Sequence, residues 1–255
     1  MNFAPGAWRY AIVPLLAAPF ALVFSVAAGV LALAIGVGAL AFFRDPDRTP
    51  PPTGVVAPCD GKVSVIRPEG ERLRVGVFMN VHNVHVVRSP FDATVAAVDH
   101  EPGVYKPAFS KDSDRNEKVH VRLTDVEEVD ATGDAEEATV ADTAENDAKP
   151  GEEADVTFIA GAFARRIHPY IEAGDDLERG QRIGHIAFGS RVDVLFPPGV
   201  TQEELAVRRG ETVTAGETVL LETAAEDLFE DIEFGIDTDD EPSADDYGGS
   251  PGGSQ

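Results

Sequence analysis

The sequence predicts a mainly β domain behind an apolar helical membrane anchor. Three observations support this fold class: a long uncharged segment near the N-terminus, a series of short Val- and Ile-rich runs after it, and repeated strand–turn–strand patterns. A chain of 255 residues is long enough for one large or two modest domains. We expect the anchor over residues 1–48, the β-rich domain over 49–222 and an acidic tail over 223–255.

The anchor is predicted from 33 consecutive uncharged residues, 11–43. As one helix they would extend about 50 Å, which exceeds the ~30 Å hydrocarbon core of a bilayer. Two geometries fit. One is a single span preceded by an interfacial piece that is broken at Pro14 and Pro19, and the other is a short helical hairpin that turns near residues 28–29. The segment is too long for the core of a cleaved signal peptide.

The charges that flank the anchor indicate its orientation. Arg44 and Arg48 follow the uncharged segment, whereas Arg9 alone precedes it. Because positively charged flanks tend to stay in the cytoplasm, we expect the domain on the cytoplasmic side of the cell membrane.

Gly, Pro and Asp clusters divide the domain into short β-type runs. We expect a helix only over residues 162–171, with a second short one over 202–206. Nine strands are expected, over residues 61–66, 73–78, 84–87, 93–98, 119–123, 156–160, 182–186, 192–196 and 219–222.

Two pairs of similar segments indicate how these strands are arranged. Residues 174–183 are echoed 36 residues later by 210–219, and residues 58–63 resemble 90–95. Each longer segment predicts a strand, a turn at its second glycine and another strand. Paired hairpins of this kind are typical of sandwich- or barrel-like folds such as lipoyl and biotinyl domains.

The net charge of −24 is concentrated in two segments. Residues 125–155, an acidic insert, hold 13 acidic residues and one basic residue, and residues 222–255 hold 12 acidic and no basic residues; the rest of the chain balances at 20 of each. Both segments have the composition of solvated or disordered chain. We interpret the acidity as adaptation to a high-salt cytoplasm, with an acidic interaction tail as the alternative. No Lys- or Arg-rich face is present, which disfavours nucleic-acid binding.

Metal sites and disulfides are disfavoured by residue counts and spacing. The single cysteine, Cys59, excludes an intramolecular disulfide and a multi-cysteine metal site. The six histidines show neither a zinc-ligand spacing with a nearby cysteine nor an HExxH motif, so we expect no metal.

Three polar clusters are candidates for chemistry. Asp60 precedes a glycine at the start of a predicted strand, where its simplest role is that of a turn residue. His82 and His85 lie in one apolar run, and a histidine there could act as a general base. Gly189 and Ser190 join two strand-like runs, and the glycine would let the serine hydroxyl bend back onto the preceding carbonyl. Alone, this pair is more typical of a hairpin turn.

In order along the chain, these clusters resemble the short form of the phosphatidylserine decarboxylase family, including archaeal relatives that act on archaetidylserine. The resemblance covers about residues 10–222 apart from the acidic insert. The motifs that carry it occupy residues 42–48, 57–63, 82–85, 107–117, 159–167, 180–184 and 188–193.

The resemblance implies that the chain is a proenzyme that cuts itself between Gly189 and Ser190. Ser190 would attack the Gly189 carbonyl, and elimination and hydrolysis would convert the serine to a pyruvoyl group, the covalent cofactor. The products would be a β chain, 1–189, with the anchor, and an α chain, 190–255, with the pyruvoyl group. The two chains would remain together as a heterodimer, and a higher oligomer is compatible.

The implied enzyme is a carboxy-lyase that converts a serine phospholipid of the membrane to the ethanolamine phospholipid. The pyruvoyl carbonyl would bind the serine amine as a Schiff base and accept the electrons released on decarboxylation, as the pyridine ring does in pyridoxal enzymes. Neither a metal nor a dissociable cofactor is then required. We expect archaetidylserine as the substrate in preference to phosphatidylserine.

The family uses an aspartate and a histidine to activate the serine, in the manner of a triad. Asp60 matches the aspartate. His85 matches the histidine that short forms keep, whereas long forms have a second histidine at the position of Arg88. His82 is an additional histidine, so the base is either His85 or His82.

Three arginines are candidate contacts for the substrate phosphate: Arg165, Arg166 and Arg191. Guanidinium groups suit this role because they bind phosphate oxygens in a bidentate manner.

Two other classes of protein remain as alternatives. A membrane-anchored lipoyl- or biotinyl-like carrier or adaptor domain would need a modifiable lysine at a hairpin tip, and neither Lys62 nor Lys106 has that setting. A serine hydrolase would keep the chain intact and use Ser190 as a nucleophile towards an ester.

Overall fold

A computed structural model of the chain describes residues 2–104, 115–126, 153–161, 166–187 and 190–222. All of them belong to one unit, which ends at Ala224. Most of the expected acidic insert and the whole of the tail lie outside the described residues, as do Arg165 and Gly189.

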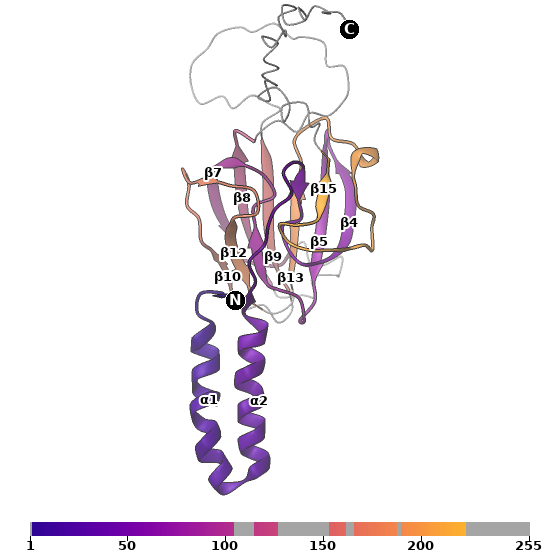
Figure 1. Ribbon diagram of the computed structural model, residues 1–255. Coiled ribbons are helices and arrows are strands. Elements are labelled where there is room, and N and C mark those ends of the chain that lie inside the picture. Colours follow the sequence, from indigo (N-terminus) through magenta and orange to yellow (C-terminus); the bar gives the residue numbers. More distant parts are fainter. Residues whose placement is uncertain (1, 105–114, 127–152, 162–165, 188–189, 223–255) are drawn as a thin grey trace, which may run out of the picture. The chain divides into compact units, whose positions relative to one another are not determined.

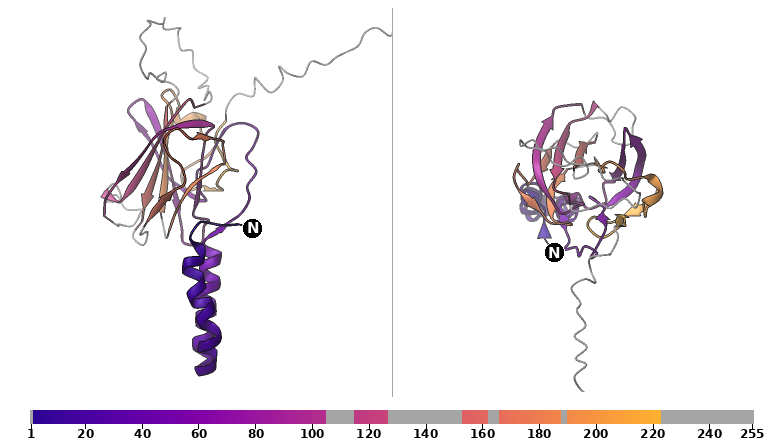
Figure 2. Two further views of the ribbon diagram at one scale, coloured as in Figure 1. Left: turned by 90° about the vertical axis from the view of Figure 1, so that its left-hand side faces the viewer. Right: turned by 90° about the horizontal axis from the view of Figure 1, so that it is seen from above.

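The apolar N-terminal segment forms a helical hairpin, shown in indigo and purple in Figures 1 and 2. Helix α1 (Ala7–Phe24) and helix α2 (Val26–Phe42) are separated by Ser25, which is extended and accepts a hydrogen bond from the amide of Ala28. The hairpin geometry is therefore present, but its turn lies three residues before the predicted one. Ser25 ends α1 and caps α2, a role that suits serine.

Small residues let the two helices approach closely. A methyl group at Gly36 would lie 2.6 Å from the side chain of Leu15, so a larger residue there would require Leu15 to move. The outer surface of the hairpin is apolar and exposed, and α1 is long and apolar enough to cross a membrane. At 18 residues α1 extends about 27 Å, close to the hydrocarbon thickness.

The main sheet is antiparallel and has eight strands. Seen from above, it curls around its core (Figure 2). In spatial order the strands are β11 (Asp176–Leu177), β7 (Ala93–Glu101), β8 (Lys118–Thr124), β9 (Ala154–Ala160), β13 (Ser190–Leu195), β5 (Arg72–Met79), β4 (Gly61–Glu69) and β14 (Thr212–Val213).

Three smaller sheets complete the described fold. The first sheet has three strands, with β12 in the centre. The second and third sheets have two strands each. Their strands are β10 (Ile167–Pro169), β12 (Arg182–Ile186) and β6 (Val86–Arg88), then β15 (Val219–Leu221) with β3 (Val55–Val56), and β1 (Asn2–Phe3) with β2 (Arg44–Asp45). A 3₁₀ helix, η2 (Gln202–Glu204), precedes β14.

The predicted internal repeat is present in the structure. The segments that begin at Gly174 and Gly210 each contain a strand, a turn and a second strand. The glycines at matching positions have φ between 69° and 93°, a region that favours glycine. Matching backbone bonds hold both copies: Gly174 N to Val95 O and Gly210 N to Val63 O at 2.7 Å, and Gly180 N to Ser89 O and Gly216 N to Ala57 O at 2.8 Å.

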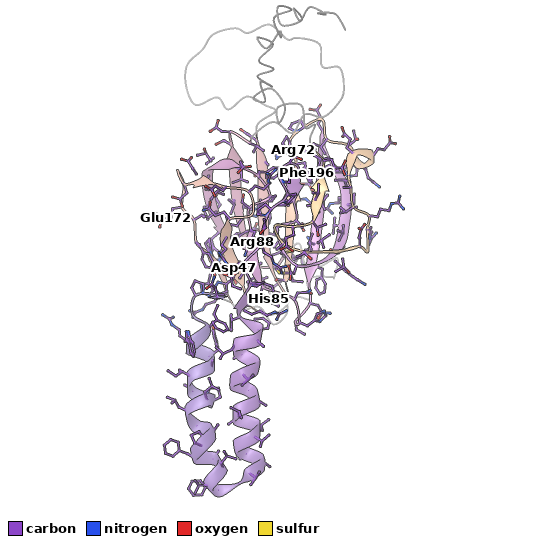
Figure 3. The ribbon with its side chains drawn as sticks, viewed as in Figure 1. Asp47, Arg72, His85, Arg88, Glu172 and Phe196 are labelled. Carbon is purple, nitrogen blue, oxygen red and sulfur yellow. The ribbon has the colours of Figure 1, made fainter. Side chains whose placement is uncertain are left out.

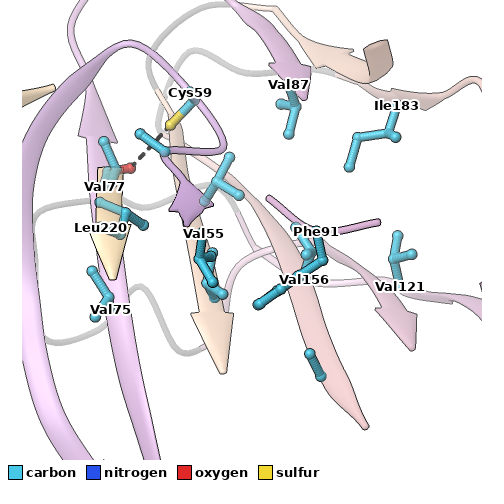
Figure 4. Packing of buried hydrophobic residues seen from close by; sticks show 14 of the residues in the cluster. Val55, Cys59, Val75, Val77, Val87, Phe91, Val121, Val156, Ile183 and Leu220 are labelled. Carbon is cyan, nitrogen blue, oxygen red and sulfur yellow. Dashed lines mark hydrogen bonds between the residues drawn. The ribbon is translucent and has the colours of Figure 1, made fainter. Parts of the chain in front are cut away.

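The core lies inside the curled sheet and consists mainly of Val, Ile, Leu and Phe side chains (Figure 4). Cys59 is buried within it, and its thiol lies 3.7 Å from the carbonyl oxygen of Val77. Burial, assisted by the charge of Asp60, raises the pKa of this thiol. Cys59 is therefore a structural residue.

The mainly β fold is confirmed, and each predicted strand has a counterpart in the structure, with small shifts at the ends. The helix predicted over 162–171 is wrong at 167–169, which form β10 paired with β12. There Ile167 enters the core and pairs with β12, and Pro169 is unsuited to a helix interior. The helix predicted over 202–206 is reduced to η2, because Leu205 pairs with Leu221.

Candidate active site

Ser190 is the first residue of β13 and lies in the middle of the main sheet. It pairs with Met79 of β5 on one side and with Ala160 of β9 on the other. Its side chain is fully buried, and Oγ donates to the sulfur of Met79 at 3.8 Å. Because Val192 also faces the core and side chains alternate along a strand, the Ser190 hydroxyl lies on the core face of the sheet.

A buried asparagine supports the strand beside Ser190. The side-chain amide of Asn116 donates to the carbonyl of Ala160 at 2.7 Å, and the backbone of Glu117 accepts a bond from the amide of Ala160 at 3.0 Å. Asn116 is 1% exposed. Neither Asn116 nor Met79 was among the predicted site residues, although residue 116 lies in one of the family-like motifs.

His85 is buried next to the segment that leads to Ser190. Its carbonyl accepts a bond from the amide of Ile186 at 3.2 Å, four residues before Ser190. Its Nδ1 lies 2.9 Å from the carbonyl of Asn83. A carbonyl can only accept, so Nδ1 carries the ring proton and Nε2 is the basic nitrogen. The pKa of His85 is lowered to about 4 mainly by burial, with smaller contributions from the charges of Arg44 and His82.

The other candidate base, His82, is exposed. Its carbonyl accepts a bond from Arg44 at 2.7 Å. Of the two histidines, His85 is the one whose ring is buried and oriented, and Figure 3 shows it at the end of the β body next to the helices. The geometry therefore favours His85.

Asp60 caps a turn and forms an ion pair. Its carboxylate accepts the backbone amide of Ala215 at 2.9 Å and contacts Arg48 at 3.2 Å. Asp92 occupies the matching position of the repeat and accepts the amide of Arg179 at 2.8 Å. The aspartate–amide bond is thus a feature of the repeated fold. Among the described residues, the hydrogen bonds of Asp60 all go to Arg48 and Ala215, so none joins it to His85.

The arginine candidates have different surroundings. Arg191 binds both oxygens of Asp193, at 2.7 and 3.0 Å, and Arg74 lies 3.5 Å from the same carboxylate. The charge of Arg191 is therefore balanced by Asp193, which disfavours a role for Arg191 in binding the substrate phosphate. Arg166 is exposed, and its carbonyl lies 3.5 Å from the amide of Ala187, so it is near the segment that leads to Ser190.

A second aromatic and histidine cluster lies beside this segment. The rings of His168 and His185 stack at 4.6 Å, and the Tyr170 hydroxyl lies 2.7 Å from Nδ1 of His185. Burial lowers the pKa of His185 to about 4 and raises that of Tyr170. Sequence reasoning missed this cluster, because it depends on the pairing of β10 with β12. Within the ranges that the structure describes, no three metal-ligating side chains lie together.

The comparison with known families decides the relationship. The family model for phosphatidylserine decarboxylase matches residues 38–221, from within α2 to the end of β15. The chain belongs to the phosphatidylserine decarboxylase family. As a member of the phosphatidylserine decarboxylase family, it is a decarboxylase, which is a lyase, of phospholipid metabolism.

Relatives in the phosphatidylserine decarboxylase family come from archaea and bacteria. A Halobacterium salinarum protein named as an archaetidylserine decarboxylase proenzyme is 48% identical over 217 residues, 85% of this chain and 96% of the relative. A Thermobifida fusca phosphatidylserine decarboxylase proenzyme is 44% identical over 195 residues, 74% of this chain and 77% of the relative. No solved structure matches the chain, so the likeness to lipoyl and biotinyl domains stays a prediction.

Proposed function

We propose that the chain is the precursor of a pyruvoyl-dependent decarboxylase of serine phospholipids, and that it cuts itself between Gly189 and Ser190. The observation that carries the proposal is the burial of the Ser190 hydroxyl at the start of β13, while the segment leading to it is bonded to His85. The word proenzyme in the names of the relatives also supports it.

In the proposed cleavage, Nε2 of His85 takes the proton from Ser190 Oγ, which attacks the carbonyl carbon of Gly189. The C–N bond breaks, the nitrogen of Ser190 receives the proton, and an ester joins the two residues. Removal of the Cα proton of residue 190 then expels the Gly189 carboxylate and leaves dehydroalanine. Addition of water and loss of ammonia convert the dehydroalanine to the pyruvoyl group.

The residues present fit this group, because it forms from Ser190 itself and needs no separate binding site. The ladders with β5 and β9 would hold residue 190 in place, and Met79 would lie beside it. When present, the pyruvoyl group supplies a ketone that withdraws the electrons left by decarboxylation. His85 would remain a buried, neutral base, bonded to the segment that leads to this position.

The two fragments should remain associated after cleavage. The fragment 190–255 contains β13, β14 and β15, which pair with β5, β9, β4 and β3 of the fragment 1–189. Because β13 is paired on both sides, we propose that the mature enzyme is a heterodimer of these fragments.

We place the helical hairpin in the membrane and the β body on the cytoplasmic side. Trp8 and Tyr10 are half-exposed at the root of the hairpin, where aromatic side chains favour the membrane interface. Arg9 and Arg44 flank the same end, which agrees with the positive-inside tendency. Both ends of a hairpin face the same side, so the body would meet lipid headgroups directly.

The proposed substrate is archaetidylserine, with phosphatidylserine as the alternative. Both relatives described above support a serine headgroup, and the archaeal relative is more similar to this chain than the bacterial one. Among the arginines, exposed Arg166 is the preferred phosphate contact, and Asp60 is the proposed acidic partner of the site.

The test is decarboxylation by the full chain purified in detergent. Ether- and ester-linked serine phospholipids are supplied in mixed micelles, and the ethanolamine lipid is measured. We expect product from the wild-type chain, faster from the ether lipid, and none from Ser190→Ala. A cleaved wild-type chain that decarboxylates neither lipid would refute the proposed activity. An intact, active chain acylated at Ser190 by an ester probe would indicate a serine hydrolase instead.

A further inference from the structure

The last residues of the hairpin contact the histidine segment directly. The ring of Phe42, which ends α2, lies 4.2 Å from the imidazole of His85 between centroids, at an interplanar angle of 33°. Phe42 also packs against a small cluster that contains Val84 and Val86, the sequence neighbours of the histidine. The aromatic ring therefore covers one face of His85, which is 2% exposed.

Arg44 forms a second connection between the hairpin and this segment. One guanidinium nitrogen donates to the carbonyl of Ala41 at 2.8 Å, and the other donates to the carbonyl of His82 at 2.7 Å. Carbonyl groups in the last turn of a helix lack partners within the helix and carry a partial negative charge, so a guanidinium is favoured there. Arg44 thus joins the end of α2 to the loop that precedes His85.

We infer that Phe42 and Arg44 are positioning residues for His85, so that the membrane hairpin forms part of the self-cleavage site. This inference rests on the proposed role of His85 as the base. Phe42 fixes the plane of the imidazole and excludes water from one face, and Arg44 holds the backbone of the loop. Both act through His85, since Phe42 contacts its ring and Arg44 bonds to the carbonyl of His82 in the loop before it.

The effect of Phe42 has a measurable sign. The groups that face His85 are the carbonyl of Asn83 and the charges of Arg44, His82 and His185, and burial is the largest cause of its low pKa of about 4. A smaller side chain at position 42 admits water, so the pKa of His85 should rise towards its ordinary value. Because the base must be neutral, the acidic limb of the cleavage rate then moves to higher pH. A rise to about 6 would slow cleavage about tenfold at pH ~5 and leave the ionisation unchanged at pH ~8.

The first experiment follows self-cleavage of the full chain synthesised in detergent micelles between pH ~5 and pH ~8. We expect Phe42→Leu to shift the acidic limb upward and Phe42→Trp to restore it. Phe20→Ala is the matched control, because Phe20 is 72% exposed on α1. Arg44→Gln should slow cleavage at every pH, and Arg44→Lys should recover part of the rate. Equal profiles for wild type, Phe42→Leu and Phe20→Ala would overturn the inference.

The second experiment measures the pKa of His85 by NMR of labelled imidazole in the full-length Ser190→Ala chain, which does not depend on cleavage. A higher pKa in Phe42→Leu together with the shifted cleavage profile supports the inference. A higher pKa without a shifted profile overturns it, while fragment formation by the wild type leaves the proposed function intact. Absence of the fragment from the wild type is the separate outcome that would refute the proposed function itself.

Discussion

Asp60 and Asp92 provide a matched pair that separates a structural from a catalytic role. Asp60 accepts a hydrogen bond from the backbone amide of Ala215 at 2.9 Å, and Asp92 accepts one from the backbone amide of Arg179 at 2.8 Å. Asparagine keeps an oxygen acceptor, so each Asp→Asn change should cost about 1 kcal/mol through loss of the charge-assisted bond. Asp60→Asn also removes the ion pair with Arg48. Because both side chains of this pair are mostly buried, its loss should cost about 1–2 kcal/mol of stability in addition. Neither cost should unfold the chain.

A catalytic role predicts a much larger difference in cleavage. General acid–base groups contribute about 10²- to 10⁴-fold, so we expect Asp60→Asn to slow self-cleavage about 100-fold or more and Asp92→Asn to change it less than about threefold. The assay is the time course of fragment 190–255 after cell-free synthesis, with thermal unfolding of each chain as the stability control. Equal cleavage rates in the two variants, or slowing in proportion to lost stability, would show that Asp60 only caps its turn.

Three further predictions concern pH, packing and the tail. His85 and His185 have a pKa of about 4 in the folded chain, compared with an ordinary value of 6.5. The stability that they contribute above pH ~6.5 should therefore be lost as the pH falls towards 4, by up to about 3 kcal/mol per histidine. Chemical denaturation of the Ser190→Ala chain at a series of pH values measures this loss, and a stability that does not change with pH would contradict it. Gly76→Ala would place a methyl group 2.5 Å from Asp193 Oδ1 and should cost about 1–3 kcal/mol of stability, seen as a lower melting temperature. Gly38→Ala is the control, because a methyl group there has no neighbouring atom within 4 Å and should leave the melting temperature unchanged. Equal melting temperatures for the two variants would refute this prediction. Removal of residues 223–255 should leave self-cleavage intact, and a lost fragment on gels would show that the tail belongs to the fold.

Most of the fold could be predicted because its determinants are local. Val- and Ile-rich runs and positive-φ glycines identify strands and turns without knowledge of their partners, and Gly174 and Gly210 revealed the repeat. The failure at Ile167–Pro169 has the opposite cause. Pro169 and the β-branched Ile167 are local signs against a helix, but they do not specify a strand, and the strand is set by the pairing with β12.

The site was predictable in its motifs but not in its contacts. Phe42 meets His85 and Met79 meets Ser190 across long separations in sequence, so only the fold reveals these pairs. Arg191 is one of three candidate phosphate contacts in the sequence, although Asp193, two residues later on the same face of a strand, already favours an ion pair. The match between residues 58–63 and 90–95 likewise contains the equivalence of Asp60 and Asp92 in the sequence itself.

The central claim, self-cleavage at Gly189–Ser190 with conversion of the serine, is tested most directly by the intact mass of the purified chain under denaturing conditions. Two fragments are predicted, 1–189 and 190–255. The second should be lighter by one ammonia than the same fragment with an N-terminal serine, and Ser190→Ala should remain uncut. A single full-length mass from an active decarboxylase, or a fragment that begins with an ordinary serine, would contradict the claim.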